Sequence, residues 1–281
     1  MATSQKTLEL KKFNMKMISF NPKESEGPII VMIGRRGMGK TFLIKDLLYH
    51  HQDIPVGTVI SGTEAGNGFY AEIVPKLFIH HEYKSEIIDN LLKRQKMMIL
   101  NMKQEIKNYG NYRTDPRAFL ILDDCLHDNK WANDKLMKYI FFNGRHMRIM
   151  MIITMQYPLG VPPALRTNID YVFIMREPYL TNRERIWKNY ASMFATFEAF
   201  CQIMDATTEN YECLVVSNST KSNKLTDQVF WYKAETRANF RLGGQEYWRI
   251  SATMADNDEE MYDPNKSKKK ARENIAVKKA W

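Results

Sequence analysis

The stretch that decides the fold is PIIVMIGRRGMGKT, which occupies residues 28–41. Its apolar part, residues 28–33, is typical of a buried strand, and apolar residues at helical spacing follow over residues 41–51. Between them, residues 34–41 have the pattern GxxxxGK[ST]. The glycines of such a loop let successive backbone N–H groups point inward, and the helix start adds the positive end of its dipole. The stretch therefore predicts a site for the phosphates of a nucleotide.

Every position of this loop is assigned to ATP binding. The set is Gly34, Arg35, Arg36, Gly37, Met38, Gly39, Lys40 and Thr41. Lys40 is expected to reach the β- and γ-phosphates, and the Thr41 hydroxyl to ligate Mg²⁺. The alternative is a glycine turn that only starts a helix. The apolar run before the loop and the helical pattern after it favour the nucleotide site.

A second apolar run ends in two carboxylates. Residues 119–124 read FLILDD, which is the Walker B pattern that accompanies such a loop. Asp123 is expected to hold Mg²⁺, and Asp124 to orient the attacking water. A strand that ends in a solvated acidic turn is the alternative, and the loop upstream argues against it.

A third apolar run ends in an amide. Residues 151–156 read MIITMQ, so Gln156 follows the strand. If this strand lies beside the one that ends in Asp123, the amide is expected near the γ-phosphate, where it senses the phosphate or positions water. A polar strand end without such a role is the alternative.

The composition is that of an ordinary globular chain. Its 281 residues are 44% hydrophobic and 26% charged, which excludes wholesale disorder. The three cysteines are too few and too far apart for a disulfide scaffold or a CxxC zinc site. No run approaches the roughly 18 apolar residues of a membrane span, so no membrane-spanning helix is expected. The formal net charge of +9 indicates an anionic partner.

Strands alternate with helices over residues 28–234, which predicts an α/β ATPase domain with a mainly parallel central sheet flanked by helices. Residues 1–27 are expected to be an N-terminal arm with one short strand. Residues 235–281 are expected to be an extension with a basic, flexible tail, because residues 263–281 hold seven Lys or Arg and two acidic residues. The expected strands are 15–20, 28–33, 56–61, 118–123, 147–154, 171–175, 212–216 and 228–232. The expected helices are 41–51, 85–106, 131–143 with Gly144 as its left-handed C′ residue, and two within 182–204.

Together these motifs resemble the FtsK–HerA superfamily of P-loop motor ATPases, and within it the poxvirus-type genome-packaging ATPases of nucleocytoplasmic large DNA viruses. The resemblance covers about residues 28–234. Besides the loop, the two acids and Gln156, it rests on SGTE at 61–64, FYAEIVPKLF at 69–78, NGRH at 143–146, LRTNID at 165–170 and DQVFWYKA at 227–234.

The resemblance implies a RecA-like ATPase that hydrolyses ATP to ADP and phosphate with Mg²⁺ and drives viral double-stranded DNA into the capsid. It implies a homo-oligomeric ring, with capsid or membrane packaging components as further partners. The implied location is the virus factory in the host cytoplasm, with the virion as a second place.

Ring motors complete each active site with an arginine from the neighbouring subunit. Arg145 and Arg166 are the two candidates, and Arg176 is a third. Arg145 is preferred because it lies at a helix–strand junction and has no acidic partner nearby in the sequence.

Three other functions stay open at this point. The chain could be a different P-loop ATPase or helicase-like DNA motor, a small-molecule kinase, or a non-motor virion component that binds nucleotide and DNA. Gln156 and the basic surplus argue against the kinase. The intact Lys40, Thr41 and Asp123 argue against a component that no longer hydrolyses nucleotide.

Overall fold

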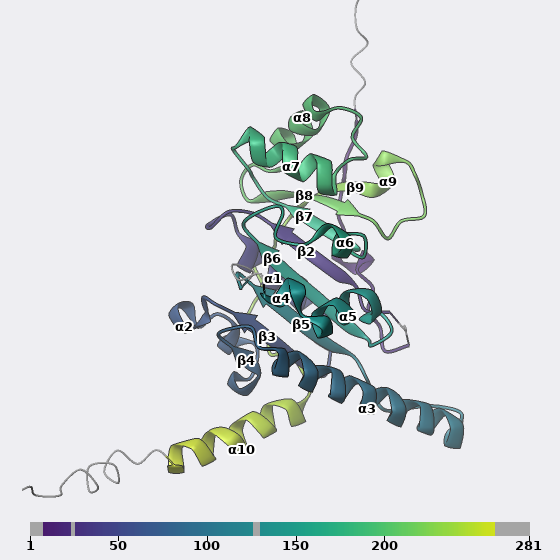
Figure 1. Cartoon of the computed structure of the whole chain (residues 1–281), viewed down its shortest axis with the longest axis vertical. Helices are drawn as coiled ribbons and strands as arrows, with labels where there is room; N and C mark the ends of the chain where they lie inside the picture. The colour runs from purple at the N-terminus through teal and green to yellow at the C-terminus, as the bar shows by residue number, and fades with distance from the viewer. Residues whose placement is uncertain (1–7, 24–25, 126–129, 262–281) are drawn as a thin grey trace, which may run out of the picture.

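The computed structural model describes residues 8–23, 26–125 and 130–261, and a nine-stranded sheet runs through them (Figure 1). The strand order is β1-β9-β8-β7-β2-β6-β5-β3-β4. Neighbouring strands from β7 to β4 are parallel, whereas β8 is antiparallel to both β7 and β9. The mainly parallel sheet predicted from the sequence is therefore confirmed. The strands are β1 Lys11–Lys12, β2 Ile29–Ile33, β3 Gly57–Ser61, β4 Ile79–His80, β5 Ala118–Asp123, β6 Ile149–Met155, β7 Tyr171–Ile174, β8 Glu212–Ser217 and β9 Val229–Lys233.

Helices cover both faces of the sheet (Figure 1). The α-helices are α1 Lys40–Tyr49, α2 Glu64–Asn67, α3 Ser85–Tyr109, α4 Lys130–Asn133, α5 Lys135–Asn143, α6 Pro163–Arg166, α7 Leu180–Tyr190, α8 Phe197–Thr207, α9 Leu225–Gln228 and α10 Gln245–Met261. Three short 3₁₀ turns lie at Met15–Met17, Tyr70–Glu72 and Lys76–Phe78. None of the helices in the described part of the chain combines the length and the hydropathy that a membrane crossing needs.

The alternation of side chains along β2 divides the core in two. Ile29, Val31 and Ile33 belong to a cluster that α3, α5, α7 and α8 cover. Ile30 and Met32 belong to a second cluster with the apolar side of α1. Successive strand residues point to opposite faces, so a strand buried on both sides needs an unbroken apolar run. That requirement explains the sequence of β2.

The N-terminal segment differs from the prediction, because residues 15–20 do not form a strand. A 3₁₀ turn occupies Met15–Met17, and the Asn14 carboxamide accepts a hydrogen bond from the Lys16 N–H at 3.0 Å. Phe13 is buried with its ring edge-on to Phe173 and Phe230. Met15, Ile18 and Phe20 are nevertheless buried, whereas Met17 is exposed.

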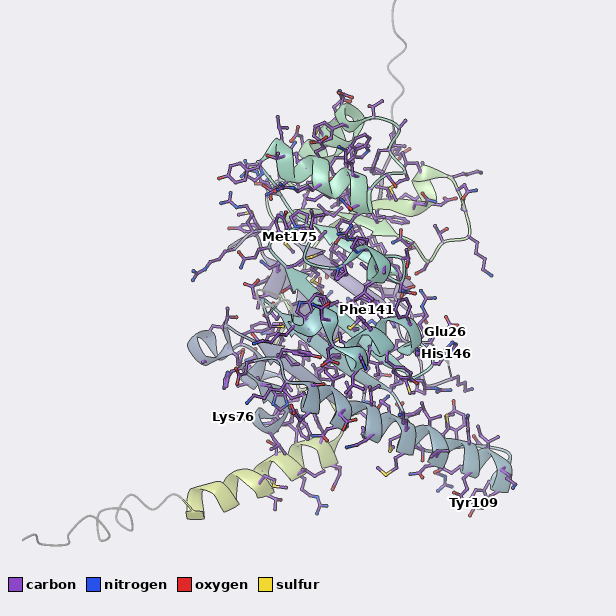
Figure 2. The ribbon with its side chains drawn as sticks, viewed as in Figure 1. Glu26, Lys76, Tyr109, Phe141, His146 and Met175 are labelled. Carbon is purple, nitrogen blue, oxygen red and sulfur yellow. The ribbon has the colours of Figure 1, made fainter. Side chains whose placement is uncertain are left out.

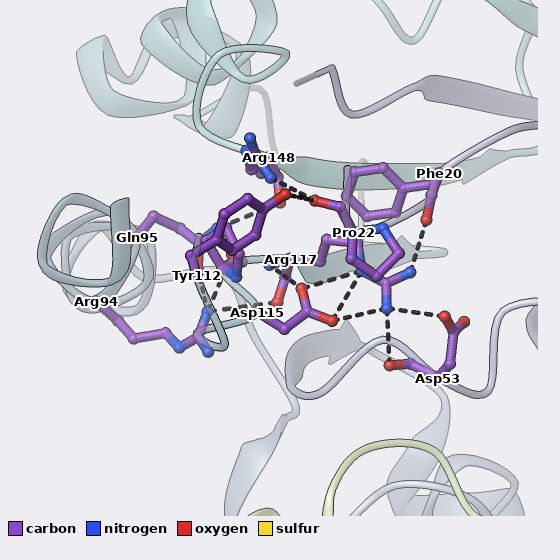
Figure 3. A network of polar contacts seen from close by, with 10 residues as sticks. Phe20, Pro22, Asp53, Arg94, Gln95, Tyr112, Asp115, Arg117 and Arg148 are labelled. Carbon is purple, nitrogen blue, oxygen red and sulfur yellow. Dashed lines mark hydrogen bonds and ion pairs between the residues drawn. The ribbon is translucent and has the colours of Figure 1, made fainter. Parts of the chain in front are cut away.

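A buried arginine holds this segment against the amino ends of β5 and β6 (Figure 3). Arg117 is 2% exposed, pairs with Asp115 and Asp53, and donates to the Phe20 carbonyl at 2.7 Å. The Pro22 carbonyl accepts from Arg148 at 2.7 Å and from the Tyr112 hydroxyl at 2.9 Å. Residues 20–22 are thus fixed beside the amino ends of the strands, whereas the loop after β2 lies at their carboxyl ends.

Two further predictions were wrong in detail. The single helix expected over residues 131–143 is two helices, because the Asp134 carboxylate caps α5 by accepting from the Leu136 N–H at 2.7 Å. Gly144 is right-handed, with φ −59°, rather than a left-handed C′ residue. Glycine is needed there because a Cβ would come within 2.3 Å of the Ile140 carbonyl oxygen.

The C-terminal extension contains regular structure that the sequence pattern did not reveal. Helix α10 is anchored near its start by Tyr247, which is buried and donates from its hydroxyl to the Gly57 carbonyl at 2.6 Å. The basic tail at residues 262–281 lies outside the described residues.

Candidate nucleotide-binding site

Three neighbouring strands deliver the predicted site residues to one edge of the sheet. The order β2-β6-β5 is parallel throughout, so the loop after β2, Gln156 after β6 and the acids that end β5 meet at the carboxyl edge. The sequence predicted each strand end separately, and the topology brings them together.

The loop at residues 34–41 has the backbone that its glycines allow. Gly37 and Gly39 have φ values of 81° and 92°, in the region that favours glycine. A Cβ at Gly37 would meet nothing within 4 Å, so the space next to this residue is open. Helix α1 begins at Lys40 directly after Gly39. The open loop at a helix start is therefore shaped for an anion.

Lys40 is held at the base of the loop. Its side-chain nitrogen donates to the Gly34 carbonyl at 2.7 Å and to the Arg35 carbonyl at 3.2 Å, and the residue is 7% exposed. Burial lowers the pKa of Lys40, while Asp124 and Asp123 raise it. The influence of both acids places the cation and the carboxylates in one electrostatic site.

A chain of hydrogen bonds links the two acids to β6. The Thr154 hydroxyl donates to Asp123 Oδ1 at 2.6 Å and accepts from the Asp124 N–H at 3.1 Å. The Gln156 amide then donates to Asp124 Oδ2 at 2.7 Å. Asp124 has φ 52°, so the chain turns sharply after Asp123. Thr154 and Gln156 thereby fix one carboxylate each.

Asp123 fits the role of a Mg²⁺ ligand. It is 5% exposed, and burial raises the pKa of its carboxyl group, while hydrogen bonding from Thr154 lowers it. The buried hydroxyl of Tyr70 faces the same carboxyl group and also lowers its pKa. No group among the described residues lies within normal hydrogen-bond distance of this hydroxyl. A buried carboxylate near a lysine and a phosphate loop gives a hard cation oxygen ligands. Thr41 is half-buried in the first turn of α1, directly after Lys40.

Two of the three arginine candidates lie away from the loop, whereas Arg176 follows β7 at the carboxyl edge and lines a pocket together with Met38 of the loop. Arg145 forms an ion pair with Asp170 and lies 3.8 Å from Glu26, two acidic residues that are distant from it in the sequence. Arg145 precedes β6, and Figure 2 shows its neighbour Glu26 toward the other end of the strands from Met175, which follows β7. Arg166 donates to the Val161 carbonyl at 2.7 Å and bonds to Asn189. Within one subunit, neither arginine belongs to the edge that carries the loop.

The sequence reasoning missed Thr154 and Tyr70. Thr154 precedes Gln156 by two positions, so strand alternation places both side chains on one face, and this signal could have found it. Tyr70 follows a loop in which the Glu64 carboxylate accepts from the Tyr70 and Ala71 N–H groups at 2.9 and 2.8 Å. No local sequence pattern predicts that arrangement.

A parallel sheet with a GxxxxGK[ST] loop after one strand, and with acids and an amide on the next two, defines a P-loop NTPase of the RecA-like α/β class. The family model described as Poxvirus A32 protein matches residues 19–235, so the chain belongs to this family. The family resemblance predicted from the sequence is thereby confirmed.

Viral relatives match over most of their length. An uncharacterized protein of Acanthamoeba polyphaga mimivirus is 40% identical over 221 residues, covering 78% of this chain and 77% of the relative. An uncharacterized protein of Invertebrate iridescent virus 6 is 39% identical over 248 residues, covering 85% and 91%.

Two solved structures share the fold. The genome packaging NTPase B204 from Sulfolobus turreted icosahedral virus 2, in complex with AMP, has a TM-score of 0.50 and 19% identity over 77% of this chain and 100% of that one. The pCW3 conjugation coupling protein TcpA, with ATPgS, has a TM-score of 0.51 and 15% identity over 75% and 60%.

Proposed function

We propose that this protein is a viral genome-packaging ATPase that hydrolyses ATP with Mg²⁺ and moves double-stranded DNA into the capsid. One observation carries the proposal: Lys40, the Asp123–Thr154 pair and the Asp124–Gln156 pair meet beside the phosphate loop. Membership of the Poxvirus A32 family supports the viral role. The name of the B204 protein, a genome packaging NTPase, agrees with it.

The loop binds and orients the nucleotide. Backbone N–H groups of residues 34–41 surround the phosphates, and Lys40 offsets their charge. The oxygens of Thr41 and Asp123 hold Mg²⁺, which supplies charge neutralisation on the phosphates when bound. Thr154 keeps the Asp123 carboxylate turned into the site through its 2.6 Å hydrogen bond.

Asp124 and Gln156 act on the attacking water. The Asp124 carboxylate accepts a hydrogen bond from this water and orients it toward the γ-phosphorus, where a new P–O bond forms as the bond to ADP breaks. Because Gln156 already donates to Asp124 Oδ2, the amide holds the carboxylate in place and responds to the γ-phosphate beside it. Loss of phosphate then changes the partners of Gln156, which follows β6.

The motor works as a homo-oligomeric ring with capsid or membrane packaging components, at the virus factory in the host cytoplasm or in the virion. An arginine from the neighbouring subunit completes each site, and Arg145 and Arg166 are the residues to test. Arg145 would have to leave Asp170 or act from the opposite edge, so its ion pair argues for a structural role.

The test is ATP hydrolysis with and without duplex DNA. Wild-type protein is expected to hydrolyse ATP in the presence of Mg²⁺ and to do so faster when DNA is added. Lys40→Ala should lose activity by several orders of magnitude with an unchanged circular dichroism spectrum. A Lys40→Ala variant that hydrolyses ATP at the wild-type rate would place the active site elsewhere.

A further inference from the structure

A pocket of about 420 Å³ lies beside the phosphate loop, lined by Gly39, Phe42, Met175, Tyr211 and Lys233 among others. Met175 follows β7, and β7 flanks β2 on the side away from β6 and β5. The pocket therefore opens on the side of the loop away from Asp123 and Asp124. It shares Gly39 with the loop, so the pocket adjoins the expected phosphate site.

The reversal of β8 builds this pocket. Because β8 is antiparallel to β7, the start of β8 lies at the carboxyl edge, directly after Tyr211. Because β9 is antiparallel to β8, its last residue, Lys233, returns to the same edge. If β8 were parallel to β7, Tyr211 would lie at the opposite edge, away from Lys233 and the loop.

Tyr211 is held in an unusual way. Tyr211 has φ 65°, and Asn210 before it has φ 50°, backbone conformations that residues other than glycine rarely adopt. The residue is 72% exposed, yet one atom of its ring would lie 3.5 Å from a Cβ placed on Gly39. The strained turn thus keeps a large aromatic face at the loop instead of in the core.

We propose that the base of a nucleoside triphosphate stacks on Tyr211 in this pocket. The proposal rests on the proposed function, since the phosphates of the same molecule must occupy residues 34–41. Phe42 and Met175 supply apolar surface around the ring, which suits a flat aromatic base. Every base has a π face, so stacking by itself tolerates different bases.

The chemistry of the lining also sets the substrate class. Lys233 is the one charged side chain among the described residues of the pocket, and none of them carries a carboxylate or a carboxamide. No side-chain carboxylate or carboxamide of this lining therefore accepts a hydrogen bond from the amino group of adenine, whereas the Lys233 ammonium can donate to the N7 that adenine and guanine share. The site takes purine nucleoside triphosphates with little preference between ATP and GTP.

The experiment measures dissociation constants of the full chain for ATP, GTP and inorganic tripolyphosphate, which has no base. Tyr211→Ala should weaken ATP and GTP about tenfold, as the loss of one stacked base implies, and leave tripolyphosphate unchanged. Tyr211→Phe keeps the ring and should stay within about twofold of wild type for all three. In turnover, Tyr211→Ala should raise KM and leave kcat unchanged.

Tyr109→Ala serves as a matched control, because Tyr109 is an 80% exposed tyrosine at the far end of α3. Equal weakening of ATP and tripolyphosphate by Tyr211→Ala would mean that Tyr211 only supports the loop, and unchanged ATP affinity would mean that it touches no base. Either result overturns the proposal while Lys40→Ala still tests the proposed function. Wild-type protein that binds none of the three ligands would overturn both.

Discussion

Replacing Thr154 by Val tests the link between the acids and β6. Valine keeps the volume and branching of the fully buried side chain but removes its hydroxyl. The Asp124 N–H then loses its acceptor at 3.1 Å, and Asp123 Oδ1 loses its donor at 2.6 Å. A buried polar group left unpaired costs about 1–3 kcal/mol of folding free energy, which corresponds to a Tm lower by about 5 °C in a chain of this size.

The same change should reduce catalysis more than it reduces stability. Removing a group that orients a metal ligand typically lowers metal affinity or activity about 10–100-fold. Burial raises the pKa of Asp123 and the Thr154 hydrogen bond lowers it, so the variant's carboxyl group should have a still higher pKa. Because Mg²⁺ needs the ionised carboxylate, activity falls as pH drops through this pKa. The acid limb of the pH profile should therefore move to higher pH in Thr154→Val.

The assay is steady-state ATP hydrolysis against Mg²⁺ concentration and pH, with Tm measured on the same preparations. Thr154→Ser retains the hydroxyl and should keep the wild-type Mg²⁺ dependence. A Thr154→Val enzyme with wild-type Mg²⁺ dependence and an unmoved acid limb would refute the positioning role, even if its Tm were lower.

Three further predictions use simpler readouts. Asp123→Asn should lose Mg²⁺-dependent nucleotide binding, whereas Asp124→Asn should lower kcat more than affinity; equal loss of affinity would contradict this division. If Arg145 or Arg166 completes the active site of a neighbouring subunit, its Ala variant should bind ATP but hydrolyse it about 10³-fold more slowly. Mixing this variant with Lys40→Ala should then restore activity. Mixed rings that are verified but show no recovery would exclude that arginine as the residue supplied by the neighbour. Arg145→Ala should in addition lower Tm, because the buried Asp170 loses its ion pair. Deleting residues 265–281 should make DNA binding less dependent on salt: the slope of log K against log salt concentration should become shallower by about 0.9 for each lost phosphate contact. An unchanged slope would show that the tail does not contact DNA.

Sequence reasoning succeeded where the signal is local. The expected strand at residues 28–33 and helix at 41–51 became β2 and α1, because an apolar run and a glycine loop act within a few residues. It failed where distant residues decide. A 3₁₀ turn forms at Met15–Met17, next to Phe13, which packs on Phe173 and Phe230. Helix α10 is anchored through Tyr247 to Gly57.

The sequence by itself predicted the glycine loop, the strand that ends in two acids and the α/β class, since glycine conformations, charge and strand periodicity depend on short segments. Only the tertiary structure decided which groups meet. Thr154 and Gln156 reach Asp123 and Asp124 because β6 pairs with β5, and Arg145 meets Asp170 instead of standing free. Tyr211 reaches Gly39 because β8 reverses direction beside β7. Strand order and direction arise from long-range packing, which no short stretch of sequence contains.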